Sequence, residues 1–346
     1  MKIKRWIRRA LVATVGLVLG VVAVAYGTAV GASAPVGFQV IRAASDSGRS
    51  FAVGVWYPTT ARAWPTTQVG AVLMNVARNA AVQGQALPLV VISHGNGGGP
   101  TRHADLAMAL AAAGYVVAAP MHRGDNFLDQ GRAGEATLFH ERVAELRATI
   151  DAMTVQWPDR ARLDTSRVAA FGFSAGGFTV LAAAGAQPNL GQLAAHCAAA
   201  PEFVCRVLRE TGSALLRSDT SVALPRFERD PRIRAIIVAA PGLGFTMDSA
   251  ALSGVTVPLQ LWNGEADGVV PYATNARRIR EVLGMGVDFR SVAGAGHPSF
   301  LVPCGLLRPS GLCSDPDGFD RRAFHATMNA AAISFLDTRL KRRRSP

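Results

Sequence analysis

Hydrophobic and polar positions along this chain follow two patterns, short continuous apolar runs and longer segments with apolar residues at helical spacing. Short continuous apolar runs, such as Leu87–Ser93, Arg167–Phe173 and Ile233–Ala239, predict strands that are buried on both faces. The longer segment Glu135–Trp157 instead repeats apolar residues at helical spacing among charges. Strands that alternate with helices predict crossover connections and a mostly parallel sheet, whose ligands bind beyond the carboxyl ends of the strands.

The same two patterns continue over the rest of the chain. We expect two early strands, Val36–Arg42 and Phe51–Tyr57, followed by an irregular segment over 58–86. The remaining predicted strands are Tyr115–Ala119, Val257–Trp262 and Val287–Val292, and the remaining predicted helices are Thr101–Ala113, Ala175–Ala186, Tyr272–Leu283 and Phe319–Leu340.

The N-terminal segment 1–34 has the composition of an export or membrane signal. Lys2–Arg9 is basic, Ala10–Val30 is uncharged and apolar, and Ala32, Ser33 and Ala34 form a small-residue site. This pattern is typical of a cleaved signal peptide. The apolar run would also reach about 31 Å as a helix, enough for an uncleaved membrane anchor through residues 10–30. Both interpretations place the rest of the chain outside the cytoplasm.

Composition excludes several classes of protein. The chain is 49% hydrophobic and 17% charged, so it can fill a core and is neither disordered nor fibrous. The net charge of +12 owes much to the basic N-terminus and to a basic tail over 341–346, and basic residues form no stripe with interleaved aromatics. We therefore expect no nucleic-acid partner, and one domain over 35–340.

The chain has four cysteines, Cys197, Cys205, Cys304 and Cys313. An even number in an exported chain predicts disulfides, and we expect the pairs that are local in sequence, Cys197–Cys205 and Cys304–Cys313. Metal binding is the alternative, but the sequence contains no CxxC and no histidine pair at zinc spacing. We expect no metal and no organic cofactor.

Ser174 is the candidate nucleophile. It lies in Gly172-Phe173-Ser174-Ala175-Gly176, a G-x-S-x-G motif between a predicted strand and a predicted helix. The flanking glycines would allow a sharp turn that presents the hydroxyl at the carboxyl edge of the sheet. A glycine-rich turn with a capping serine is the alternative.

A serine nucleophile needs a base and an acid, expected in the order Ser, acid, His. His297 follows a predicted strand in a loop, whereas His325 lies within a predicted helix, where a surface or packed histidine is the ordinary explanation. Asp267 follows the strand Val257–Trp262 and is the candidate acid that orients the base. Asp248, after the preceding strand, and Glu265 are the alternatives.

An oxyanion hole completes this constellation, because backbone N–H groups must face the negative charge that develops during acyl transfer. One donor is the residue after the nucleophile, Ala175, and the other comes from the loop after the strand Leu87–Ser93. Asn96 is our choice in that loop, and we expect His94 to brace the loop.

Together these parts resemble an α/β-hydrolase, and more closely the bacterial predicted dienelactone-hydrolase group that is related to platelet-activating-factor acetylhydrolases. The resemblance covers about residues 36–340 and implies Ser174, Asp267 and His297 as triad, with Asn96 and Ala175 as oxyanion hole. Dienelactone hydrolases use a cysteine nucleophile, which makes dienelactone doubtful as substrate; the acetylhydrolases place the acid one strand earlier. The matching stretches are 87–98, 103–125, 164–179, 230–242, 262–271 and 294–304.

The fold expected from this resemblance is a mostly parallel twisted sheet flanked by helices, with a small helical lid inserted at 187–231. An ordinary helical insertion is the alternative for that segment. The expected function is an exported serine hydrolase that cleaves carboxylic esters of small molecules or lipids through an acyl-enzyme on Ser174. A cell-envelope acyltransferase with the same triad is the second hypothesis, and a non-catalytic binding protein is the third.

Overall fold

The computed structural model describes residues 2–45, 48–217 and 225–341. The predicted turn residues 46–47, part of the predicted insertion (218–224) and the tail residues 342–346 lie outside this description. Across the described residues one sheet of 10 strands forms the centre of the molecule. In spatial order its strands are β10 (Asp288–Val292), β9 (Leu259–Gly264), β8 (Ile233–Ala239), β7 (Leu163–Phe173), β5 (Leu87–Ser93), β6 (Val116–Pro120), β2 (Ser50–Pro58), β1 (Val36–Ala44), β4 (Val72–Arg78) and β3 (Trp64–Val69).

The strands from β10 to β6 are all parallel, and β2 is antiparallel to β6 and to β1. The carboxyl ends of the parallel strands therefore meet along one edge. All the predicted strands are present. β5, β6 and β9 are buried at every position, as continuous apolar runs predict, whereas the edge strand β10 is partly exposed.

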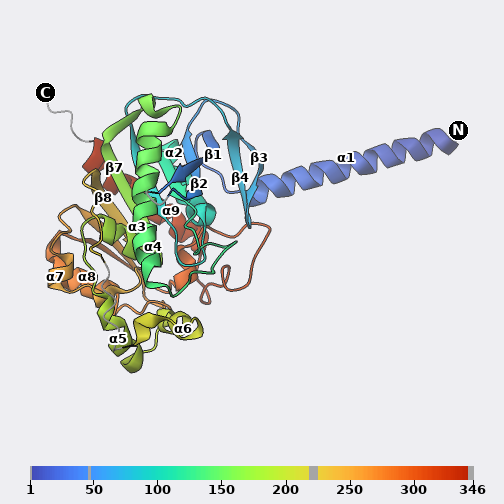
Figure 1. Ribbon diagram of the computed structural model, residues 1–346. Coiled ribbons are helices and arrows are strands. Elements are labelled where there is room, and N and C mark those ends of the chain that lie inside the picture. The colour runs from blue at the N-terminus through green and yellow to red at the C-terminus, as the bar shows by residue number, and fades with distance from the viewer. Residues whose placement is uncertain (1, 46–47, 218–224, 342–346) are drawn as a thin grey trace.

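Helices cover both faces of the sheet (Figure 1). One hydrophobic layer packs α2 (Ala104–Ala112) and α9 (Arg321–Leu336) against one face, and the other packs α3 (Ala136–Asp151), α4 (Ala175–Ala183) and α8 (Ala276–Leu283) against the opposite face. Alternate residues of the central strands β5, β7 and β8 enter each layer, which confirms the predicted sheet flanked by helices.

The prediction of an irregular segment at 58–86 was wrong. Strands β3 and β4 form an antiparallel hairpin there, and Gly70 occupies its turn with a φ of 59°. β3 is one of the two edge strands of the sheet and alternates exposed with buried residues. Its sequence, WPTTQV, contains few apolar residues because only one face is covered.

Helix ends also differ from the predictions. α9 begins at Arg321 instead of 319, because the Asp320 carboxylate accepts the Ala323 N–H at 3.0 Å and caps the helix. α8 begins at Ala276 instead of Tyr272. The residues before it form turns, in which the N–H groups of Thr274 and Asn275 donate to Pro271 O.

The N-terminal helix α1 (Lys2–Thr28) projects away from the body (Figure 1). Within its segment Arg5–Thr28 an 18-residue window has a mean hydropathy of 2.3, and the segment is long and apolar enough to cross a membrane. Beyond the helix, Val30 pairs with β4: its N–H donates to Leu73 O and its carbonyl O accepts from Asn75 N, both at 2.8 Å. The segment that follows α1 is thus hydrogen-bonded to the sheet through β4.

Between α4 and β8 lie two short helices, α5 (Leu193–Ala199) and α6 (Phe203–Glu210), at the carboxyl end of the sheet (Figure 1). The disulfide Cys197–Cys205 links them, and Cys304–Cys313 closes a second loop. Both predicted pairings are confirmed. A further short helix, α7 (Ser249–Leu252), follows β8.

Candidate active site

Ser174 lies at the turn between β7 and α4 in an unusual backbone conformation. Its φ and ψ are 56° and −119°, a combination that a non-glycine residue adopts only where the surroundings enforce it. Its N–H donates to Ala239 O at 3.0 Å, and its carbonyl O accepts the N–H groups of Gly177 and Gly242 at 2.9 and 3.1 Å. These bonds hold the strained turn, and the Ser174 side chain lines a pocket.

The flanking glycines are required by sterics. A Cβ on Gly172 would lie 2.1 Å from Gly176 O, and a Cβ on Gly176 would lie 1.9 Å from Ser93 O. Real Cβ atoms do not approach backbone oxygens this closely, so the turn needs glycine at both positions. This is the role that the G-x-S-x-G spacing predicts.

Three predicted side chains meet at the carboxyl edge of the sheet. His297 Nε2 lies 3.0 Å from Ser174 Oγ, and His297 Nδ1 lies 2.7 Å from Asp267 Oδ2. The contact between His297 and Ser174 joins residues 123 positions apart in the sequence, and the contact between His297 and Asp267 joins residues 30 positions apart. The arrangement is the hydrogen-bonded chain of hydroxyl, imidazole and carboxylate that activates a serine.

Asp267 is held for this contact by its own loop. Its second oxygen, Oδ1, accepts the N–H groups of Val269 and Val270, both at 2.9 Å, and its side chain is 1% exposed. The two N–H bonds leave Oδ2 directed at His297.

The alternative acids lie elsewhere. Asp248 Oδ1 accepts the Ala251 N–H at 2.8 Å and caps α7. Glu265 Oε1 accepts the Ser291 hydroxyl at 2.8 Å at the surface. The structure thus brings Asp267 to the imidazole and gives Asp248 and Glu265 other partners.

His325, the alternative base, supports the loop that carries His297. Its Nδ1 lies 2.6 Å from Asp105 Oδ2 and its Nε2 lies 2.9 Å from Ser299 O, two residues after His297. The Ser299 hydroxyl donates to Asp315 Oδ1 at 2.8 Å. Two carboxylates on separate elements therefore hold this loop from behind.

The loop after β5 holds the predicted oxyanion residue Asn96. The Asn96 side-chain Nδ2 donates to Asp125 Oδ1 at 2.7 Å, and the Gly97 N–H donates to the same oxygen at 2.6 Å. Since the side-chain amide is occupied by Asp125, the backbone N–H is the group of Asn96 that suits an oxyanion hole. Asn96 and Ala175 line the same pocket as Ser174.

Arg142 stabilises this loop from within the core. Its Nη1 donates to Asp125 Oδ2 at 2.6 Å, its Nη2 donates to His94 O, and both members of the Arg142–Asp125 pair are nearly inaccessible. His94 is itself buried, with Nδ1 at 2.7 Å from Gly95 O and Nε2 accepting the His122 N–H at 3.2 Å. His94 therefore braces the loop.

Burial shifts the pKa values of the ionisable side chains behind this loop. Burial lowers the pKa of His94 and of His122 well below the usual value, and Arg142 acts in the same direction on both. Burial raises the pKa of Glu145, and Arg123 opposes that rise. Neutral imidazoles are thus favoured next to the buried Arg142 guanidinium.

The sequence patterns did not single out Asp125, Arg142, Asp105 or Asp315. Arg142 lies four residues after Leu138 and four before Leu146, on the buried face of α3, so the helical spacing fits its burial but does not reveal its partner Asp125. A weak indication of Asp125 exists in the sequence, because it lies in the polar loop that follows the strand predicted at 115–119, at the carboxyl end where ligands bind.

Comparisons with known proteins fit this geometry. A sequence model of the family described as "Serine aminopeptidase, S33" matches residues 84–229. This region includes Asn96 and Ser174 but is less than half of the chain, so it marks a similarity to that family. A comparison with curated proteins found no match.

The structure is similar to that of a ferulic acid esterase from Streptomyces cinnamoneus. The two agree with a TM-score of 0.59 at 19% sequence identity, over 92% of this chain and 95% of that chain. At this identity the likeness concerns the fold. The parallel sheet, its helices on both faces and these comparisons define the α/β-hydrolase fold, as predicted.

Proposed function

We propose that this protein is a serine hydrolase that cleaves carboxylic esters through an acyl-enzyme on Ser174. The observation that carries the proposal is the contact chain from Ser174 Oγ through His297 to Asp267, at 3.0 and 2.7 Å. The family similarity and the esterase with the same fold support it. The resemblance to the dienelactone-hydrolase group remains part of the proposal, with serine in place of cysteine.

The proposed reaction has two halves. Ser174 Oγ attacks the ester carbonyl carbon while its proton passes to His297 Nε2, and the N–H groups of Asn96 and Ala175 stabilise the oxyanion. The C–O bond to the alcohol breaks, His297 returns the proton to the leaving oxygen, and the acyl group stays on Ser174. Water then attacks the acyl carbon with His297 as base, which releases the acid and restores the serine hydroxyl.

The test is hydrolysis of 4-nitrophenyl butyrate by the wild type and by Ser174→Ala. Loss of the nucleophile should lower kcat about 10⁶-fold, because the triad acts as a unit. An organophosphonate probe should label Ser174 in the folded wild type. Full turnover by the variant would refute the proposal, and failure to label the wild type would support a binding protein instead. The ratio of new ester to free acid formed in the presence of an added alcohol measures acyl transfer against hydrolysis.

We also propose that the domain works outside the cytoplasm, attached through α1. Two disulfides suit an oxidising compartment. The exposed apolar length of α1 and the basic residues at its N-terminal end favour a membrane-spanning role. The hydrogen bonds of Val30 with β4 favour retention of the helix over cleavage at Ala34.

A further inference from the structure

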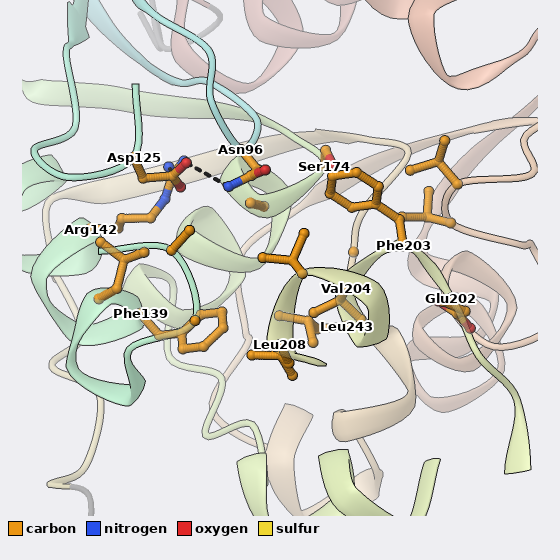
Figure 2. Close-up of a pocket in the computed structure, with 18 residues that line it drawn as sticks. Asn96, Asp125, Phe139, Arg142, Ser174, Glu202, Phe203, Val204, Leu208 and Leu243 are labelled. Carbon is orange, nitrogen blue, oxygen red and sulfur yellow. Dashed lines mark hydrogen bonds and ion pairs between the residues drawn. The ribbon is translucent and has the colours of Figure 1, made fainter. Parts of the chain in front are cut away.

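The pocket beside Ser174 has walls of apolar side chains. Leu138 and Phe139 come from α3, Val204 and Leu208 from α6, and Leu243 from the segment after β8 (Figure 2). The pocket encloses about 80 Å³. It therefore accommodates a hydrocarbon group directly next to the candidate nucleophile.

Among the described residues, three charged side chains reach this pocket, and all three are engaged by protein partners. Asp125 and Arg142 pair with each other at 2.6 Å, and Asp125 also binds Asn96 (Figure 2). Glu202 accepts the Asn275 side-chain amide at 3.0 Å and lies 3.1 Å from His196 Nε2. A substrate hydroxyl or carboxylate in this pocket would compete with these contacts for partners.

The α6 wall is fixed to the rest of the site. The disulfide Cys197–Cys205 ties it to α5, and Arg209 Nη2 donates to Cys197 O at 2.5 Å. Glu202, the residue before α6, also binds Asn275 at the start of α8. The pocket is thus preformed, with a wall that limits its length.

The position of His297 indicates which half of an ester enters. The pocket is lined by Asn96, Ser174 and Ala175. His297 does not line it. The leaving alcohol must reach His297 for its proton and so departs on that side. The pocket therefore lies on the acyl side of the reacting carbon.

We infer that this pocket selects aliphatic acyl groups that carry no hydroxyl, phenol or charge. The inference rests on the proposed function and specifies its substrate class. It also separates this protein from the structural neighbour by chemistry, because ferulic acid carries a phenolic hydroxyl, and the charged side chains that line this largely apolar pocket already have protein partners.

The first experiment compares 4-nitrophenyl acetate, butyrate and hexanoate with the full chain. Each added methylene should raise kcat/KM about fourfold until the pocket is full, the ratio that corresponds to about 0.8 kcal/mol per buried CH₂. The matched 6-hydroxyhexanoate ester should react at least tenfold more slowly than hexanoate, because its hydroxyl is buried unpaired. Equal rates for this pair, or a preference for the ferulate ester, would overturn the inference.

The second experiment locates the selection. Val204→Trp fills the pocket and should lower the hexanoate-to-acetate ratio of kcat/KM at least tenfold, with circular dichroism as the check of folding. Arg206→Trp is the matched control, because Arg206 lies on the same helix with an exposed side chain and does not line the pocket. Equal ratios in both variants would overturn the assignment to this pocket.

The possible outcomes distinguish failure of the proposed function from failure of the inferred acyl selection. If no ester is cleaved and Ser174 resists the phosphonate probe, the proposed function fails and the inference fails with it. If esters are cleaved through Ser174 without chain-length or hydroxyl discrimination in the wild type, only the inference fails. The wild-type substrate series separates these two cases even if Val204→Trp does not fold.

Discussion

At the scale of single residues, the carboxylate of Asp267 decides how the imidazole of His297 is presented. It accepts two backbone N–H bonds through one oxygen and contacts His297 through the other. An acceptor at this place holds the tautomer in which Nε2 can take the serine proton. Asp248 and Glu265 share the chemistry of Asp267 but have other partners.

Asp267→Asn should therefore lower kcat about 10⁴-fold, because an amide favours the wrong tautomer. Asp248→Asn and Glu265→Gln are the matched controls and should keep kcat within a few fold. The measurement is steady-state hydrolysis of 4-nitrophenyl butyrate at constant pH. A large loss in Asp248→Asn, with Asp267→Asn active, would reassign the acid.

At the scale of elements, the loop of His297 depends on a helix from the end of the domain. His325 on α9 lies between Asp105 of α2 and the Ser299 carbonyl. The base is thus positioned by a contact that joins segments 220 residues apart. This makes His325 a positioning residue for the proposed reaction.

His325→Gln should lower kcat by about 10- to 100-fold with little change in KM, since misplacement of a reacting group by about 1 Å has an effect of this size. His140→Gln is a suitable control, because His140 lies on α3 and contacts Pro225 O instead. Steady-state kinetics and the pH profile of kcat/KM provide the measurement. An unchanged kcat in a folded His325→Gln would show that the loop holds its position without this contact.

At the scale of the whole molecule, buried imidazoles couple stability to pH. Burial lowers the pKa of His103 to about 3, with Asp105 opposing and with His325 and Arg102 reinforcing the shift. Above pH 6.5 this histidine is neutral in both the folded and the unfolded chain, so its contribution to stability is fully present. Between pH 6.5 and about 3 only the unfolded chain gains the proton, and stability falls as pH falls.

The urea unfolding midpoint should therefore decrease from pH 7 to pH 5, with a loss of stability of up to about 1.4 kcal/mol per pH unit for each such group. His103→Phe keeps an aromatic ring beside Phe171 and Phe173 and should make the dependence shallower. Urea titrations at several pH values provide the measurement. The same pH slope in the variant and the wild type would contradict this coupling.

The attachment of α1 is a second property of the whole molecule. If the helix is retained, the mature chain should remain with the membrane after a carbonate wash, and its mass should include residues 2–28. The double variant Leu17→Arg and Val18→Arg interrupts the apolar run and should release the chain or block export. A mature N-terminus just after Ala34 would show cleavage instead.

Much of this protein follows from local sequence. Continuous apolar runs were sufficient for the strands buried on both faces, since a fully covered strand needs apolar residues at every position. The G-x-S-x-G spacing located Ser174 because a tight strand-to-helix turn excludes side chains at its flanks. The same patterns missed both strands of the hairpin at 58–86, β3 and β4, and β3 is an edge strand whose exposed positions are polar.

Tertiary structure alone decided which residues act on one another. Several acids and histidines followed strands along the chain, and only the packed sheet showed that Asp267 meets His297 while His325 supports the loop behind it. The pairing of Arg142 with Asp125 was likewise invisible in the helical pattern of α3, although that pattern places position 142 on the buried face. The physical reason is that local sequence governs backbone sterics and burial periodicity, whereas the partner of a charged side chain depends on contacts between segments distant along the chain.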